Sequence, residues 1–106
     1  SGYNPKIIPR TMKLFETEAT IKFHTNEQQQ YTVLELSTHD RPGLVSSVAQ
    51  VFLQCNIQII NAKLTTLGDQ VEDIFFITTA DNQPLDSEQS AHLEESLITS
   101  LTSVDS

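Results

Sequence analysis

The chain of 106 residues has few cysteines, few basic residues and no long apolar run, and each scarcity excludes a class of protein. Its single cysteine, Cys55, excludes an internal disulfide and any multi-cysteine metal site, which fits a reducing, cytoplasmic setting. No apolar run approaches the ~20 residues of a membrane-spanning helix, so we expect no membrane partner. The length suits one domain with one hydrophobic core.

Basic residues are also unevenly placed. Six Lys and Arg stand against 14 Asp and Glu, which gives a formal net charge of −8, and the last basic residue is Lys63. Nucleic acids and anionic membrane surfaces attract proteins that carry a basic stripe. Because this chain has no such stripe, we expect no nucleic-acid partner.

The first residues differ in composition from the rest. Residues 1–17 contain two prolines, scattered basic residues and few periodic apolar residues, a pattern typical of a linker or an extended arm. The chain begins with Ser1-Gly2 rather than with Met, so we expect a fragment of a longer protein, with the arm leading from an upstream domain. The folded domain is then expected to occupy residues 18–106.

Periodicity divides the remainder into six elements. Two-residue alternation predicts four strands, and apolar residues at spacings of three and four predict two helices. The strands are expected at 20–24, 31–37, 57–66 and 70–79, and the helices at 44–55 and 87–101. Asn56 is a plausible stop for the first helix, and Asp86 with Gln89 has the spacing of a capping box before the second.

Two details of the strands carry further predictions. The apolar phase of the third strand slips at Ile59-Ile60, which predicts a β-bulge or a bend. The strand at 70–79 is apolar on both faces, with Phe75 and Ile77 on one and Ile74 and Phe76 on the other. We expect helices to cover one face and a partner surface to cover the other.

The order strand, strand, helix, strand, strand, helix predicts an α+β fold, with a four-stranded antiparallel sheet and two helices on one face. No strand is predicted after the second helix. The strand at 20–24 can pair with the strand at 31–37 as a hairpin. It would then occupy the edge that a strand after the last helix fills in an ordinary βαββαβ sandwich.

The stretch from Asp40 to Leu44 lies between a predicted strand and a predicted helix. Asp40 can cap the helix start, because its side chain can accept from a backbone N–H two or three residues further on. Pro42 fits the first turn of a helix, and Gly43 lets a neighbouring backbone or a ligand come close. Helix starts attract carboxylates and other anions. The turn is therefore either a cap alone or a cap that also binds a ligand.

Several stretches resemble an ACT domain, the small regulatory module of amino-acid-sensing proteins. They are Val33 to Leu36, Asp40-Arg41-Pro42-Gly43-Leu44, the helix around Val48 and Phe52, and Asn61 to Thr66. The stretch Gly68 to Ile77 is similar to the C-terminal ACT domain of bacterial PII uridylyltransferase/uridylyl-removing enzymes, and 9–15 and 21–23 resemble the segment joining their two ACT domains. The resemblance covers nearly the whole chain and implies a ferredoxin-like ACT sandwich.

In that enzyme family the chemistry resides in a nucleotidyltransferase domain and an HD hydrolase domain, with Mg²⁺ as the expected metal. The tandem ACT domains are associated with glutamine sensing. The resemblance therefore implies a regulatory module that has no catalytic residue, cofactor or metal of its own. Its implied partners are an amino acid (glutamine is favoured), another ACT domain in tandem or as a homodimer, and the PII signal protein as substrate of the parent enzyme.

The resemblance also implies roles for single residues. Asp40 would accept hydrogen bonds from the ammonium group of a bound amino acid, while backbone N–H groups near Gly43 and Leu44 would bind the carboxylate of that amino acid. Arg41 is either a surface residue or a further contact to a carboxylate. In ACT dimers the ligand often lies between the turn of one domain and a strand of its neighbour, so Asn61 is either an exposed strand residue or faces a partner's ligand. The candidate ligand site is Asp40, Arg41, Pro42, Gly43, Leu44 and Asn61, and we expect it to be complete only beside a second ACT domain.

Other functions fit parts of the same pattern. A pure assembly module would pair its doubly apolar strand with another ACT domain and hold no ligand, and an ACT domain of another amino-acid-regulated protein would show the same turn. An acylphosphatase-like enzyme has a similar topology, but Asp40 in the turn would repel phosphate. Glu72 and Asp73 are adjacent in a strand and point to opposite faces, so they form no acid/base pair and are interpreted as structural or solvated residues.

Overall fold

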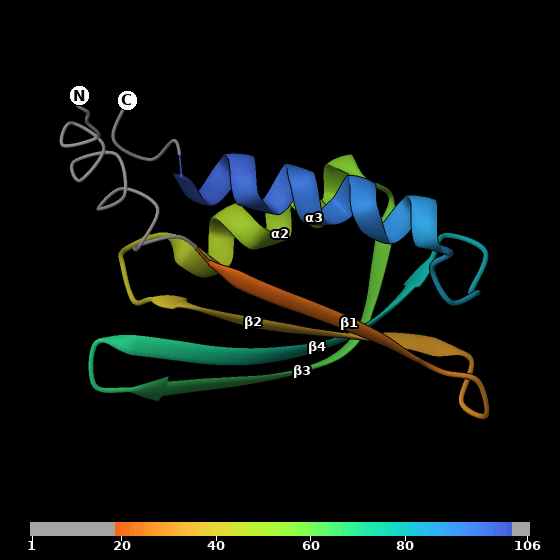
Figure 1. Ribbon diagram of the computed structural model, residues 1–106, viewed down its shortest axis with the longest axis horizontal. Helices are drawn as coiled ribbons and strands as arrows, with labels where there is room; N and C mark the ends of the chain where they lie inside the picture. Colours follow the sequence, from red (N-terminus) through yellow and green to blue (C-terminus); the bar gives the residue numbers. More distant parts are fainter. Residues whose placement is uncertain (1–18, 103–106) are drawn as a thin grey trace, which may run out of the picture.

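The computed structural model describes residues 19–102, which form a sheet with both helices on one face (Figure 1). The elements in chain order are β1 (Thr20–Asn26), β2 (Tyr31–His39), α2 (Leu44–Gln54), β3 (Ile57–Leu67), β4 (Gln70–Thr79) and α3 (Ser87–Thr102). This arrangement confirms the predicted α+β, ferredoxin-like fold class. The linker predicted at 1–17 lies outside the described residues.

The sheet has the strand order β1-β2-β4-β3, and every neighbouring pair is antiparallel. β1 forms a hairpin with β2 in which Phe23 lies opposite Leu34, and it takes the outer position beside β2. The prediction that the N-terminal strand fills this edge is therefore confirmed. β1 and β2 each continue two residues beyond the predicted ends, to Asn26 and His39.

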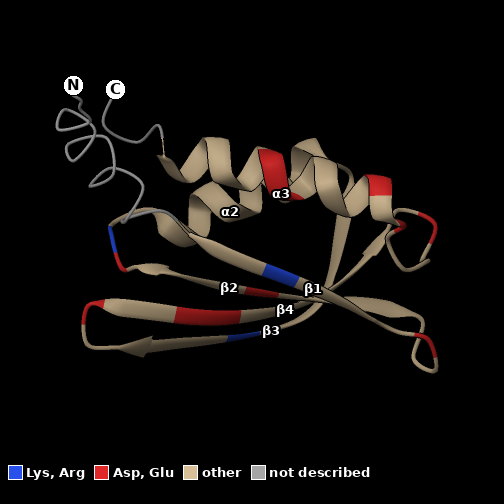
Figure 2. Cartoon of the chain, in the orientation of Figure 1, with Lys and Arg blue, Asp and Glu red and all other residues tan. Residues whose placement is uncertain are grey.

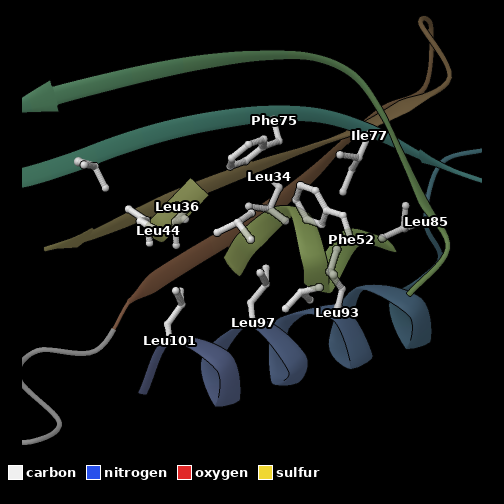
Figure 3. Close-up of a cluster of buried hydrophobic side chains, with 13 residues drawn as sticks. Leu34, Leu36, Leu44, Phe52, Phe75, Ile77, Leu85, Leu93, Leu97 and Leu101 are labelled. Atoms are coloured by element: carbon white, nitrogen blue, oxygen red, sulfur yellow. The ribbon is translucent and has the colours of Figure 1, made fainter. Parts of the chain in front are cut away.

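The core lies between the sheet and the two helices. Leu44, Val48 and Phe52 repeat at four-residue spacing along α2, so they share the face that packs on the sheet. α3 repeats the same spacing with leucines, and the core side chains of both helices point toward those of β2 and β4 (Figure 3). The most deeply buried members are Leu34, Leu36, Val48, Phe52, Ile77, Leu93 and Leu97, each at most 2% exposed. Burying one such side chain stabilises the fold by about 1.5–3 kcal/mol.

β3 is an edge strand with a bulge. Its register with β4 shifts between Ile59 and Asn61, which confirms the slip predicted at Ile59-Ile60. Every residue of β3 after Ile57 is exposed, including Ile60 (56%) and Leu64 (54%). The outer edge of the sheet is therefore apolar and unpaired within the described residues.

The sheet face opposite the helices is partly apolar. Ile74 and Phe76 of β4 are half-buried there, and the ring of Phe76 meets Tyr31 edge-on at a centroid distance of 5.5 Å. The prediction that β4 is apolar on both faces is confirmed, because Phe75 and Ile77 are buried on the helix side. The partner surface expected over the open face stays a prediction.

Candidate functional site

The turn before α2 has a conformation that the sequence did not predict. α2 begins at Leu44, its N-cap is Gly43 with φ 79° and ψ 6°, and no side chain of residues 19–102 caps it. The N–H of Leu44 donates to the carbonyl of Arg41 at 3.3 Å, so residues 41–44 form a β-turn with Pro42 second and Gly43 third. Proline followed by a positive-φ glycine is the pattern of a type II turn.

Two predictions about this turn are therefore wrong. Asp40 does not cap α2, and Pro42 precedes the cap instead of lying in the first helical turn. The Pro-Gly pair closes its own turn, which places the helix start beyond the reach that a cap at Asp40 would need. The backbone N–H of Asp40 instead donates to the carbonyl of Asp69 at 2.9 Å, which ties the turn to the β3–β4 connection.

The Gly43→Ala variant is expected to be less stable by about 1–2 kcal/mol, because an L-residue is strained in the left-handed region. A Cβ at Gly43 would meet no atom of the described residues within 4 Å, so the loss would come from backbone conformation and not from a clash. Chemical denaturation measures the difference. Ser46→Ala, at an exposed position of the same helix start, is the matched control and should change stability by less than about 0.5 kcal/mol. Equal stability of the Gly43→Ala variant and the wild-type chain would contradict the assigned turn.

The turn, the start of α2, β3 and β4 surround a shallow hollow of about 320 Å³. Its polar lining comes from the turn, from Ser46 of α2, from Thr66 of β3 and from β4, while Leu44, Leu64 and Val71 supply apolar walls. The backbone N–H groups of Val45 and Ser46 at the helix start have no hydrogen-bond partner among residues 19–102. Larger hollows lie elsewhere, and one of about 570 Å³ is beside the start of α3.

The start of α3 differs from that of α2 because its own residues cap it. Asp86 Oδ1 accepts from the N–H of Gln89 at 2.7 Å, and Gln89 Oε1 accepts from the N–H of Asp86 at 2.9 Å. This confirms the predicted capping box and leaves fewer free amides for a ligand. The larger hollow has three acidic side chains and no Lys or Arg in its lining, whereas the hollow at the turn before α2 has Arg41 and a helix start that no side chain of the described residues caps, so the latter is the better place for an anionic group.

The side chain of Arg41 is hydrogen-bonded to the C-terminal end of α3. Its Nη1 donates to the carbonyl of Leu101 in the last turn of α3 at 2.7 Å, in a half-buried setting. A cation at a helix C-terminus satisfies an end carbonyl and interacts favourably with the helix dipole. In this structure the guanidinium therefore joins the turn to α3, and the contact predicted between Arg41 and a ligand carboxylate stays a prediction.

Asn61 is not brought to the turn within one chain. It lies opposite Phe76 in the register of β3 and β4, and therefore faces the side of the sheet away from the helices. Its Oδ1 accepts from the N–H of Ala62 at 2.9 Å. Asp40, Arg41, Gly43 and Leu44 line the hollow together, whereas Pro42 and Asn61 do not. The role of Asn61 toward a partner's ligand stays a prediction.

The structure adds Asp73 to the site. It alternates with Val71 and Phe75 on the helix side of β4, is 4% exposed and lines the hollow with Asp40. Its Oδ1 accepts from the N–H of Thr65 at 3.0 Å. Burial raises the pKa of Asp73 above the ordinary carboxyl value, the Thr65 N–H lowers it, and the nearby Asp40 carboxylate raises it further. The sequence did indicate this position, because Asp73 lies two residues from both Val71 and Phe75 and so shares their face of the strand.

The raised pKa of Asp73 predicts the direction in which the free energy of unfolding changes with pH. A carboxyl with a higher pKa in the folded state binds its proton more tightly there than in the unfolded chain. Stability should therefore fall as pH rises from the unfolded pKa, about 4, through the folded pKa of Asp73. The Asp73→Asn variant should show a shallower fall in this window, since the amide does not titrate and its oxygen can still accept from Thr65. Urea denaturation across the pH series measures the slopes.

The matched control for this experiment is Glu72→Gln, the exposed neighbour on the opposite face of β4. The Glu72→Gln variant should show the same dependence of the free energy of unfolding on pH as the wild-type chain. A slope in the Asp73→Asn variant equal to that of the wild-type chain would show that Asp73 does not titrate differently in the folded state.

Charge is distributed unevenly over the described residues (Figure 2). Lys22, Arg41 and Lys63 are the Lys and Arg residues of the range 19–102, and acidic residues occupy several loops, β2, β4 and α3. In this range no group of three or more His, Cys, Asp or Glu side chains is placed to hold a metal ion. None of the described helices is long and apolar enough to cross a membrane.

The fold and the turn define a class of domain. A four-stranded antiparallel sheet with two helices on one face and a glycine turn before the first helix is a ferredoxin-like arrangement consistent with an ACT domain. A crystal structure of an unknown protein from Galdieria sulphuraria shares this fold, with a TM-score of 0.55 and 16% identity over 68% of this chain and 39% of that one. No family model matches the sequence.

Curated relatives then identify a particular protein that this chain resembles. This chain is 44% identical over 99 residues to the bifunctional uridylyltransferase/uridylyl-removing enzyme of Nitrosococcus oceani, and the match covers 93% of this chain and 11% of the relative. It is 42% identical over 96 residues to the enzyme of the same name from Ectopseudomonas mendocina, covering 90% of this chain and 11% of that relative. The predicted resemblance to this enzyme is confirmed, and the chain spans about 11% of the length of these relatives.

Proposed function

We propose that this chain is a regulatory, amino-acid-sensing module of a PII uridylyltransferase/uridylyl-removing enzyme, with glutamine as its ligand. The proposal includes an ACT domain at residues 18–106, preceded by a linker at 1–17. Catalysis would belong to domains outside this chain, which would use Mg²⁺ and act on the PII signal protein in the cytoplasm. The chain alone would catalyse nothing, and ligand binding would control the other domains.

The observation that carries this proposal is the pairing of opposite charges in one hollow. The N–H groups of Val45 and Ser46 at the start of α2 have no partner within the described part of the chain, and a helix N-terminus favours a carboxylate. Asp40 lines the same hollow and can accept from an ammonium group. An α-amino acid carries both groups on one carbon, so it can satisfy both ends of the hollow at once.

The structure refines which amides are available. The N–H of Leu44 is already used by the carbonyl of Arg41, so Val45 and Ser46 replace Leu44 as carboxylate donors in this proposal. The side chain of the amino acid would lie toward Leu64 and Thr66 of β3. Since β3 is an edge strand, a neighbouring ACT domain would close the hollow on that side, and this is where Asn61 of a partner would be offered.

Arg41 offers a route from the ligand to the rest of the protein. It lines the hollow and also bonds the last turn of α3. A ligand carboxylate that attracts the guanidinium would weaken its bond to Leu101 and change the position of the end of α3. Occupancy of the hollow would in this way be transmitted along the second helix.

A second candidate function is assembly without a ligand. It is supported by the edge of β3, where Ile59, Ile60, Leu64 and Leu67 are 45–56% exposed, and by Val45 of α2, which is 51% exposed beside it. Exposed apolar edges of this kind favour pairing with another strand. Another ACT domain, in tandem or as a homodimer, is the partner that would fit in either function.

Calorimetric titration with L-glutamine separates the two functions. The titration is run at a low and at a high concentration of the 106-residue chain, with the oligomeric state measured by sedimentation. Saturable binding supports the sensing module, and binding that strengthens with self-association shows that a neighbour completes the site. Self-association without any binding would support the assembly module in its place. Asp81→Asn, in an exposed loop away from the turn, is the control variant and should bind as the wild-type chain does.

A further inference from the structure

We propose that Asp73 forms the inner wall of the ligand hollow and, together with Asp40, holds the ammonium group of the bound amino acid. This assignment rests on the proposed amino-acid-binding function and deepens it. It makes the amine, and not the ligand's carboxylate alone, the group on which recognition depends. The ligand class it names is a primary amine that also carries a carboxylate.

The first support is the position of Asp73. It is 4% exposed, although aspartate is rarely buried without a partner, and it lines the same hollow as the start of α2. Its Oδ1 accepts from the N–H of Thr65, and no hydrogen bond to Oδ2 is found among residues 19–102. A buried carboxylate that is satisfied on one oxygen only has an acceptor available for a donor that enters the hollow.

The second support is that, among the described residues, no Lys or Arg forms an ion pair with either carboxylate, although Arg41 lines this hollow and Lys22 lines another hollow with Asp73. Among the described residues the ion pair found is that of His24 with Glu35, on β1 and β2. Arg41 lines the hollow, but its Nη1 is directed to the carbonyl of Leu101. Two neighbouring carboxylates without a counter-ion repel each other, and a bound cation would relieve this repulsion.

The third support concerns which cation fits. The hollow makes a poor metal site, because its two carboxylates lie among apolar side chains such as Leu44, Leu64 and Val71, and no third His, Cys, Asp or Glu joins them among the described residues. An ammonium group needs fewer acceptors, and its attached carbon chain suits the apolar walls. Burial and the Asp40 carboxylate both raise the pKa of Asp73, and a bound ammonium would oppose both effects.

The test compares L-glutamine with 4-carbamoylbutanoate, which is glutamine without its amino group. Calorimetry on the 106-residue wild-type chain is expected to show at least ~10-fold weaker binding of the analogue, since the loss of a charged hydrogen bond is worth at least that factor. Asp73→Asn should weaken glutamine binding by about 10-fold and narrow the difference between the two ligands. Glu72→Gln, adjacent in β4 but exposed on the other face, should bind both ligands as the wild-type chain does.

A measurement on the wild-type chain keeps the test valid if Asp73→Asn fails to fold. The side-chain carboxyl carbon of Asp73 is followed by NMR across pH, with and without saturating L-glutamine, and its titration midpoint is expected to fall when the ligand is added. Glutamine binding with an unchanged midpoint, or equal binding to a folded Asp73→Asn variant, would overturn this assignment and leave the amino-acid-binding function standing. An absence of glutamine binding to the wild-type chain would overturn the proposed function and this assignment with it.

Discussion

Replacing Phe52 with alanine is expected to lower the free energy of unfolding by about 3–5 kcal/mol, a large share of the ~5–15 kcal/mol of a typical domain. The side chain is 1% exposed and meets Phe75 edge-on, with ring centroids 5.2 Å apart. It therefore fastens α2 to the sheet, and alanine would leave a cavity that the surrounding side chains fill only in part. Because α2 also forms one side of the hollow, the variant should bind glutamine poorly even where it remains folded.

Urea denaturation gives the size of this effect, and the next residue provides the control. Leu53 is 75% exposed on the same helix, so Leu53→Ala removes an apolar side chain of similar size without opening a cavity. Its expected loss is below about 0.5 kcal/mol. Similar losses in the Phe52→Ala and Leu53→Ala variants would mean that α2 does not pack on β4 as described.

The Asp40→Asn variant is expected to bind L-glutamine about 10- to 100-fold more weakly than the wild-type chain, because removing the charged partner of an ammonium group costs roughly 1.5–3 kcal/mol. Its stability should change little. The Asp40 side chain is exposed and has no hydrogen bond within the described residues, and the backbone bond from its N–H to Asp69 is kept. Asparagine has nearly the same shape, so a change in affinity would report the charge.

Calorimetric titration of both chains measures the difference, with thermal unfolding as the check on stability. Asp81→Asn removes one negative charge elsewhere on the surface and controls for the change in net charge. If Asp40→Asn and Asp81→Asn both keep the affinity of the wild-type chain, Asp40 is not a ligand contact.

The fold could be predicted because its determinants are local. Two-residue alternation marks β2 and β4, the change of phase marks the bulge between Ile59 and Asn61, and four-residue spacing marks both helices. Asn56 ends α2 in the left-handed conformation, with φ 59°, as its position suggested. The edge position of β1 followed from the missing strand after the second predicted helix. These patterns need no knowledge of distant contacts.

The site was predicted less completely because it depends on tertiary contacts. The hydrogen bond from Arg41 to Leu101 joins residues 60 positions apart, and no local sequence pattern predicts it. Asp40 matched a capping pattern, but the Pro-Gly turn moved the helix start and the backbone of Asp69 took its N–H. Asp73 was interpreted as structural or solvated because it is adjacent to Glu72 and the two side chains point to opposite faces of the strand. Its parity with Val71 and Phe75 was the better guide to its place beside the hollow.

Binding of an amino acid in the hollow at the turn before α2 can be located by titrating the ¹⁵N-labelled chain with L-glutamine and recording which backbone amides shift. We expect saturable shifts at Gly43, Val45 and Ser46 and at Thr66 of β3, which also lines the hollow, with the β1–β2 loop at 27–30 unchanged. Saturable shifts confined to the other hollow around Cys55 and His92, or no shifts at any concentration, would contradict binding at this turn.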